Sequence, residues 1–173
     1  TKFFKRMGCE ASTNAYSITG STPLVDSLLS VRYALYSEYI PNTDLVNYIQ
    51  ESGGTYLYEN LYTLPLGFVL PYDLADNWQY QMENPAEVQN DLCLLLGTDD
   101  VLVPVETEVS GSGCTFTADM AGEYYVYIQN KKVKNVKASL PSGEKNFSNV
   151  DRGYLLEMGN LSEGSRITLT PGE

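Results

Sequence analysis

The stretch Glu-Tyr-Tyr-Val-Tyr-Ile-Gln at Glu123–Gln129 predicts a β-strand and, with its neighbours, the fold of the C-terminal half. Aromatic and β-branched residues favour strands, and alternate side chains of a strand point to opposite faces. Tyr124, Val126 and Ile128 are therefore expected on one face, and Tyr125 and Tyr127 on the other.

Five further strand candidates surround this stretch. Turns that contain Gly, Ser or Asn separate them at spacings near the ~8–12 residues typical of β-sandwiches. The sequence therefore predicts a small, antiparallel, jelly-roll-like β-sandwich over residues 101–173. The five candidates are Val101–Val105, Cys114–Thr117, Val133–Leu140, Tyr154–Met158 and Ile167–Thr170.

Residues 1–100 combine helix and strand signals. Thr22-Pro23 and Asn84-Pro85 are typical helix starts, because a polar side chain caps the first turn and proline suits its first position. Glu87 stands where a capping box places its acidic residue. The predicted fold class is therefore α+β, with an N-terminal α/β part over residues 1–100 followed by the sandwich.

The other elements expected in this part are one helix, three strands and a loop. Thr43 is expected to cap the helix, and Gly53-Gly54 to end it. The helix is expected at Asp44–Gln50, the strands at Val31–Tyr36, Thr55–Tyr58 and Leu66–Leu70, and a polar, aromatic loop at Tyr72–Glu83.

The composition excludes several kinds of site. The chain has no histidine, which removes Ser-His-Asp and Cys-His catalysis and every histidine-based metal site. The three cysteines, Cys9, Cys93 and Cys114, form no Cys-x-x-Cys motif, so no metal site and no cofactor are expected. Two arrangements stay open: three buried thiols, or one disulfide and one thiol.

The charge is unevenly distributed along the chain. The net charge is −11, and between Tyr33 and Asn130 there is no Lys or Arg but fifteen Asp and Glu. An acidic surface repels nucleic acid, so no nucleic-acid partner is expected. It fits either the solubility of an exported domain or attraction of a basic partner. No apolar run approaches the ~20 residues that a membrane-spanning helix needs.

Fourteen tyrosines and one tryptophan are the remaining signal. Tyr72, Asn77, Trp78 and Tyr80 fall in the polar loop, where rings stack on the C–H faces of sugars and an amide bonds their hydroxyls. These four are the candidate glycan-binding residues. The alternative is that the rings cover the core while their polar tips reach water. Because the chain has 22 acidic residues, no catalytic pair stands out, and no catalytic residue is assigned.

Three segments in order resemble the YfhO family of bacterial multi-pass membrane proteins. Pro23–Tyr33 is similar to that family's Asp-x-Leu-Leu-x-Val-Lys/Arg-Tyr segment. Tyr58–Phe68 is similar to its Tyr-Glu-Asn … Leu-Pro-x-Gly segment, and Asn84–Asn90 to its Asn-Pro-x-x-x-Gln-Asn. The first 97 residues carry most of the likeness. The residues taken from these segments as structural markers are Asp26, Tyr33, Glu59, Asn60, Pro65, Asn84 and Pro85.

The resemblance implies an extracytoplasmic domain of a bacterial cell-membrane protein, beside the transmembrane helices of its parent chain. Such proteins resemble C-type glycosyltransferases, which transfer a sugar from a polyprenyl-phosphate donor to a cell-envelope polymer such as lipoteichoic acid. In that class the catalytic acid lies in an early loop between membrane helices, so the present chain is expected to be non-catalytic. Its implied task is to bind or position the acceptor, and its implied partners are those helices and a cell-envelope glycan or glycolipid.

Two other functions remain as alternatives. One is a free-standing carbohydrate-binding module, and the other is a structural or adhesive surface domain. Flanking apolar spans of ~20 residues in the full reading frame would separate the first alternative from the membrane-protein hypothesis.

Overall fold

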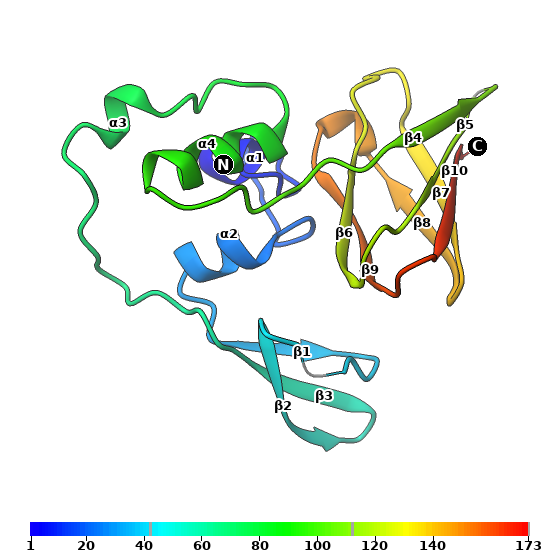
Figure 1. The fold of residues 1–173 in the computed structure, drawn as a ribbon, viewed down its shortest axis with the longest axis horizontal. Coiled ribbons are helices and arrows are strands. Elements are labelled where there is room, and N and C mark those ends of the chain that lie inside the picture. Colours follow the sequence, from blue (N-terminus) through cyan, green and yellow to red (C-terminus); the bar gives the residue numbers. More distant parts are fainter. Residues whose placement is uncertain (42, 112, 173) are drawn as a thin grey trace. The chain divides into compact units, whose positions relative to one another are not determined.

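The computed structural model describes residues 1–41, 43–111 and 113–172, which form two compact units. Unit 1 comprises Thr1–Gly20 and Asp76–Glu173, and unit 2 comprises Ser21–Ala75 (Figure 1). This division differs from the boundary expected near residue 100, because both ends of the first hundred residues join the sandwich. Helices and antiparallel sheets occur together, so the predicted α+β class is confirmed.

The C-terminal part of unit 1 is the predicted β-sandwich. Its five-stranded sheet has the order β4-β5-β10-β7-β8, and β6 pairs with β9 in a second sheet; every pair is antiparallel. The strands are β4 (Thr107–Ser110), β5 (Gly113–Thr117), β6 (Gly122–Tyr127), β7 (Asn135–Leu140), β8 (Gly143–Ser148), β9 (Leu155–Leu161) and β10 (Arg166–Pro171), with a short 3-10 helix, η1 (Val150–Arg152), before β9.

One apolar core lies between the two sheets. Alternation decides which side chains enter it: in β10, Ile167 and Leu169 are buried, whereas Thr168 and Thr170 are exposed. Tyr124 belongs to the same core, and Val126 and Ile128 pack against it. The prediction that Tyr124, Val126 and Ile128 share one face of the strand is therefore confirmed, and the structure shows that this face is the one toward the core.

Two helices make up the N-terminal part of unit 1. These are α1 (Lys2–Arg6) and α4 (Pro85–Leu95), while α3 (Leu74–Asn77) spans the sequence boundary between the units. Asn84 caps α4, as its side chain accepts a hydrogen bond from the Ala86 N–H at 3.1 Å. Glu87 Oε1 accepts from the side-chain amide of Asn84 at 3.1 Å, and this contact orients the cap.

Residues 1–20 attach to the sandwich through specific polar contacts. The Leu155 N–H donates to the Gly8 carbonyl at 2.8 Å, and Arg152 pairs with Glu10 at 2.8 Å. Gly20 has φ +81°, and a Cβ there would lie 2.5 Å from the carbonyl oxygens of Gly8 and Leu155, so only glycine fits. These long-range contacts explain why the N-terminus belongs to unit 1.

The described residues of unit 2 form the helix α2, the start of α3 and a three-stranded antiparallel sheet of order β1-β3-β2. The helix α2 begins as predicted, with Thr22 as its cap and Pro23 in its first turn. The elements are α2 (Pro23–Leu28), β1 (Tyr33–Tyr36), β2 (Val46–Ser52) and β3 (Thr55–Asn60).

The helix expected at Asp44–Gln50 is wrong, because this segment contributes to β2. Gly53 and Gly54 have φ values of +58° and +77°, which suit a two-residue hairpin turn, and Ser52 pairs directly with Thr55 across it. The Thr43 hydroxyl accepts from the Val46 N–H at 3.2 Å, but the contact closes a local turn. Strand pairing therefore outweighs the helix-start signal.

Two predicted strands are also wrong, and two strands besides β2 were not predicted. Residues 66–70 and 101–105 form no strand in the described structure. Pro65 and Pro71 flank the first segment and Pro104 interrupts the second, and proline cannot donate to a ladder. The polar strands β4 and β8 lack the apolar alternation on which the prediction rested.

The cysteines and the helices answer two questions that the sequence raised. Cys9 and Cys93 are buried thiols and Cys114 is a half-buried thiol, so the alternative with a disulfide is wrong. Within the residues that the structure describes, no helix has the length and apolar character needed to cross a membrane.

Candidate functional site

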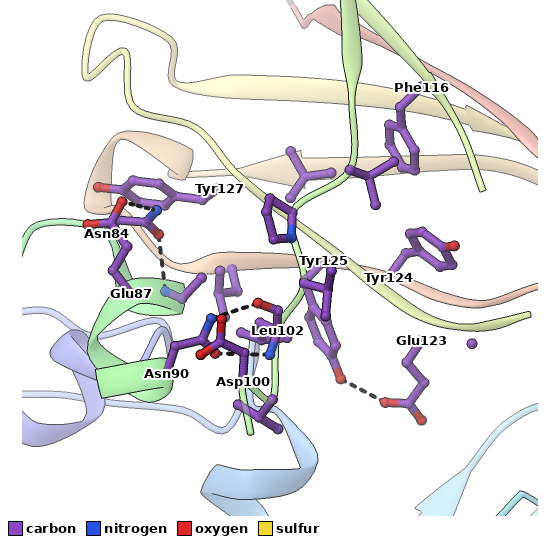
Figure 2. Close-up of a pocket in the computed structure, with 18 of the residues that line it drawn as sticks. Asn84, Glu87, Asn90, Asp100, Leu102, Phe116, Glu123, Tyr124, Tyr125 and Tyr127 are labelled. Atoms are coloured by element: carbon purple, nitrogen blue, oxygen red, sulfur yellow. Dashed lines mark hydrogen bonds between the residues drawn. The ribbon is translucent and has the colours of Figure 1, made fainter. Parts of the chain in front are cut away.

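Unit 1 contains a groove of about 650 Å³ (Figure 2). Three segments supply most of its lining: the start of α4, residues 100–105 and the strand β6. The volume lies within the range of roughly 300–1,000 Å³ that is usual for small-ligand sites. This groove is therefore the leading candidate for a binding site.

The side chain of Asn90 in α4 holds residues 100–105, one wall of the groove, in place. The Asn90 amide donates to the Leu102 carbonyl at 2.7 Å, and the Leu102 N–H donates back to Asn90 Oδ1 at 3.0 Å. Both backbone groups of Leu102 are thereby satisfied without a neighbouring strand. The two bonds fix the position of residues 100–105, which belong to neither sheet.

The tyrosines of β6 are fixed by their hydroxyl groups. Tyr125 donates to Glu123 at 2.8 Å, as Figure 2 shows, and Tyr127 donates to the Glu83 carbonyl at 2.9 Å. The Tyr124 hydroxyl lies 2.8 Å from Asp119 Oδ1, and burial raises the pKa of this tyrosine. The rings therefore have defined positions along one wall of the groove.

The groove is acidic. Its described lining includes four carboxylate side chains and no Lys or Arg. A negative, partly enclosed site repels phosphates and other anions, and it attracts cations or accepts hydrogen bonds from neutral hydroxyl groups. The four acidic residues are Glu87, Asp100, Asp119 and Glu123.

The groove combines rings with hydrogen-bond acceptors, which are the two features that sugar recognition uses. A tyrosine ring offers an apolar face with a polar edge. No group of three or more His, Cys, Asp or Glu is placed to hold a metal ion anywhere in the described chain. The chemistry that this arrangement supports is non-covalent binding of a polyhydroxylated ligand.

The four residues of the polar loop lie elsewhere. The Trp78 indole donates to the Val88 carbonyl of α4 at 2.9 Å, and its ring lies 4.9 Å from that of Tyr80. Trp78 and Tyr80 are half-buried, and burial raises the pKa of Tyr80. Asn77 is exposed in α3, and Tyr72 is fully exposed in unit 2. None of the four lines the groove.

No pattern in the sequence marked the groove residues as a site. The alternation in Tyr124–Ile128 indicated that Tyr125 and Tyr127 share the face opposite Tyr124, and this was the available signal. What the sequence lacked was the opposite wall, since Asn90 and Leu102 come to line the same groove as β6 only after folding.

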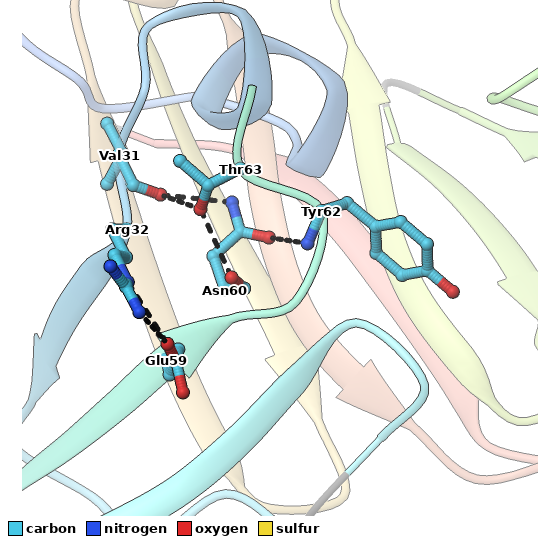
Figure 3. Close-up of polar contacts among 6 residues, drawn as sticks. All are labelled: Val31, Arg32, Glu59, Asn60, Tyr62 and Thr63. Atoms are coloured by element: carbon cyan, nitrogen blue, oxygen red, sulfur yellow. Dashed lines mark hydrogen bonds and ion pairs between the residues drawn. The ribbon is translucent and has the colours of Figure 1, made fainter. Parts of the chain in front are cut away.

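A second hollow of about 480 Å³ lies in unit 2, and its lining includes the structural markers Glu59, Asn60 and Pro65. Figure 3 shows the polar contacts around Asn60: its amide donates to the Val31 carbonyl at 3.1 Å, and its Oδ1 accepts from the Tyr62 N–H at 3.0 Å. Arg32 forms an ion pair with Glu59 at 3.0 Å. These contacts organise the turn that follows β3.

The other markers occupy structural positions. Asp26 lies in the first turn of α2, where Ser21 donates a hydrogen bond to its carboxylate. Tyr33 begins β1 beneath the Arg32 guanidinium, whose carbon lies 5.3 Å from the ring centre. Pro65 lines the second hollow, and Pro85 is buried in the first turn of α4.

Comparison with known proteins gave one result. The family model described as "Bacterial membrane protein YfhO" matches residues 1–101. Neither the curated proteins nor the solved structures gave a significant match. The matched residues include unit 2 and the α4 wall of the groove, whereas β6 follows them in the chain.

Proposed function

Because the chain belongs to the family of bacterial membrane protein YfhO, we propose that it is a glycan-binding extracytoplasmic domain of a membrane-embedded glycosyltransferase. The parent protein would transfer a sugar from a polyprenyl-phosphate donor to a cell-envelope glycopolymer of the lipoteichoic acid type. The domain itself performs no chemistry in this proposal, and its task is to bind and position the acceptor.

The observation that carries the proposal is the groove along β6. Tyr125 and Tyr127 provide ring surface, and Glu87, Asp100 and Glu123 provide acceptors for sugar hydroxyls. The Tyr125–Glu123 bond holds ring and carboxylate 2.8 Å apart at their polar ends. A preorganised pair of this kind lowers the ordering cost of binding.

The charge of the groove selects which part of the acceptor it binds. Four carboxylates with no lining cation disfavour a polymer phosphate and the phosphate of a polyprenyl donor alike. The groove therefore suits the neutral sugar units of an acceptor and leaves the donor to the membrane part of the parent protein.

The polar loop is the second location for the same ligand. Trp78 and Tyr80 form a tilted pair of rings, and Asn77 and Tyr72 are exposed. The groove is preferred because it is partly enclosed and supplies carboxylates, whereas the Trp78 indole N–H is already bonded to the Val88 carbonyl.

Titration of the purified chain with neutral glucose- and N-acetylglucosamine-containing disaccharides, followed by NMR, tests the proposal. We expect the Tyr125→Ala variant to bind about tenfold more weakly, since it loses the ring contact. Tyr125→Phe keeps the ring and should retain most of the affinity. Tyr62→Ala, an exposed tyrosine of unit 2, is the matched control and should bind like the wild type.

Three results would change this assignment. Loss of binding in Tyr72→Ala or Tyr80→Ala, with Tyr125→Ala unaffected, would place the glycan in the polar loop. Tighter binding of poly(glycerol phosphate) than of the neutral sugars would contradict the charge argument. No binding of any glycan at millimolar concentration would favour the structural or adhesive alternative.

A further inference from the structure

Unit 2 exposes an apolar segment at residues 61–72. The twelve residues are Leu-Tyr-Thr-Leu-Pro-Leu-Gly-Phe-Val-Leu-Pro-Tyr, and none is charged. Leu66 and Val69 are 95% and 98% exposed, and Tyr72 is fully exposed. Leu61, Tyr62, Phe68 and Leu70 are also exposed. Single exposed apolar residues are ordinary, but so many in one uncharged run indicate a surface that contacts a partner.

Both ends of the apolar segment are anchored. Asn60 Oδ1 accepts from the Tyr62 N–H, and the Leu64 N–H donates to the Ser27 carbonyl at 3.2 Å. At the other end, Leu74 is buried and its N–H donates to the Pro71 carbonyl at 3.2 Å. The exposed residues are therefore held between two ordered points.

The sequence of the segment keeps it out of the sheet. Pro65 and Pro71 donate no backbone hydrogen bond, and they limit the conformations of the chain. Gly67 stands between them, and residues 66–70 form no strand. Figure 3 shows the ring of Tyr62 pointing away from the polar cluster around Asn60.

The charge around the segment restricts the partner. Residues 21–75 contain one arginine and six acidic residues, and the arginine is paired with Glu59. Such a unit repels an anionic membrane surface and has no basic cluster to attract one. A complementary partner is apolar at its centre and uncharged overall, as a zwitterionic phospholipid surface is.

We propose that residues 61–72 dock this domain on the surface of a phospholipid bilayer. Leu66, Phe68 and Val69 enter the boundary between headgroups and acyl chains, while Tyr62 and Tyr72 lie at headgroup level. Aliphatic residues inside an interface with tyrosines at its rim are the distribution that membrane interfaces favour. Because the chain belongs to a family of membrane proteins, a bilayer surface is expected nearby. The proposed docking does not depend on glycan binding.

Flotation of the 173-residue chain with vesicles of pure phosphatidylcholine tests the docking surface. We expect the wild type to float with the vesicles, and the Leu66→Asp/Val69→Asp variant to bind about tenfold more weakly or worse. Both residues are almost fully exposed, so the variant should keep the wild-type circular dichroism spectrum. The matched control is Leu94→Asp, which adds a charge at an exposed leucine of α4 and should float normally.

Two further measurements make the test more specific: the dependence of binding on lipid charge, and whether the protein forms dimers. Vesicles with added phosphatidylglycerol should bind less protein, because unit 2 is acidic. The proposal fails if the wild type does not float, if Leu66→Asp/Val69→Asp floats equally well, or if binding increases with anionic lipid. It also fails if sedimentation without vesicles shows a dimer that this variant abolishes, because a second copy would then cover the segment. Tyr125→Ala should float normally, which separates this test from that of the groove.

Discussion

Unit 1 and unit 2 differ in how many apolar residues they bury. Thirteen buried residues form the core cluster of the sandwich in unit 1. In the described part of unit 2, the buried apolar residues are only Val25, Tyr58 and Leu74. Small units bury less of their surface, so unit 2 must depend more on polar contacts.

Tyr58 makes several of the polar and aromatic contacts on which unit 2 depends. Its hydroxyl donates to the Ile40 carbonyl at 2.6 Å and accepts from the Ile40 N–H at 2.7 Å. Its ring meets those of Tyr36 and Tyr48 edge-on, at 5.4 and 5.6 Å between centres. The comparison shows that the burial of apolar side chains stabilises unit 1, whereas contacts of tyrosine rings and hydrogen bonds of their hydroxyl groups stabilise unit 2.

The largest effect is expected from removing volume in the core of unit 1. Leu156 is completely buried, so Leu156→Ala should lower the free energy of unfolding by about 3 kcal/mol, through lost burial and a residual cavity. Urea denaturation followed by circular dichroism measures it. Leu94→Ala, at an exposed site, should change stability by less than about 0.5 kcal/mol. If Leu156→Ala lowers the free energy of unfolding no more than Leu94→Ala does, the packing of the core does not determine the stability of unit 1.

A smaller effect is expected from removing one oxygen in unit 2. Tyr58→Phe keeps the ring but deprives Ile40 of two hydrogen bonds, and it should cost about 1–2 kcal/mol. Amide hydrogen exchange should accelerate at Ile40 and in β3 while the sandwich keeps its protection. Tyr33→Phe, on an exposed ring, is the control. If amide hydrogen exchange is unchanged in Tyr58→Phe, the hydroxyl group does not stabilise unit 2, and unit 2 depends on the packing of its side chains alone.

The smallest effect is expected from pH. Burial raises the pKa of Asp26, and the hydrogen bond from Ser21 opposes the shift. Folding therefore disfavours the charged carboxylate, so stability rises as pH falls through the raised pKa and is lost as pH increases. The Asp26→Asn variant should remove this pH dependence, with a change below about 1 kcal/mol because solvent screens a partly exposed group.

Thermal unfolding between pH 4 and pH 7 measures the Asp26 effect. The exposed Glu38→Gln is the matched control. A wild-type slope of the opposite sign, with stability falling as the pH is lowered and Asp26→Asn abolishing that fall, would show that the carboxylate stabilises unit 2.

The candidate sites differ in how far the sequence could reveal them. The apolar segment is continuous in sequence, and its lack of charge can be read directly. The groove is assembled from α4, residues 100–105 and β6, and its walls meet through the Asn90–Leu102 bonds. A site built from distant segments leaves no local pattern.

The sequence by itself determined the elements that local physics decides. Capping by Thr22 and Asn84 with the prolines after them placed α2 and α4, and alternation separated the two faces of β6. Three ordered segments indicated the family. Only the tertiary structure decided that Val46–Ser52 is a strand, that residues 1–20 join unit 1, and that the groove exists. The reason is physical: these features depend on contacts between residues far apart in the chain, whose energies outweigh local preference and cannot be read from neighbouring residues.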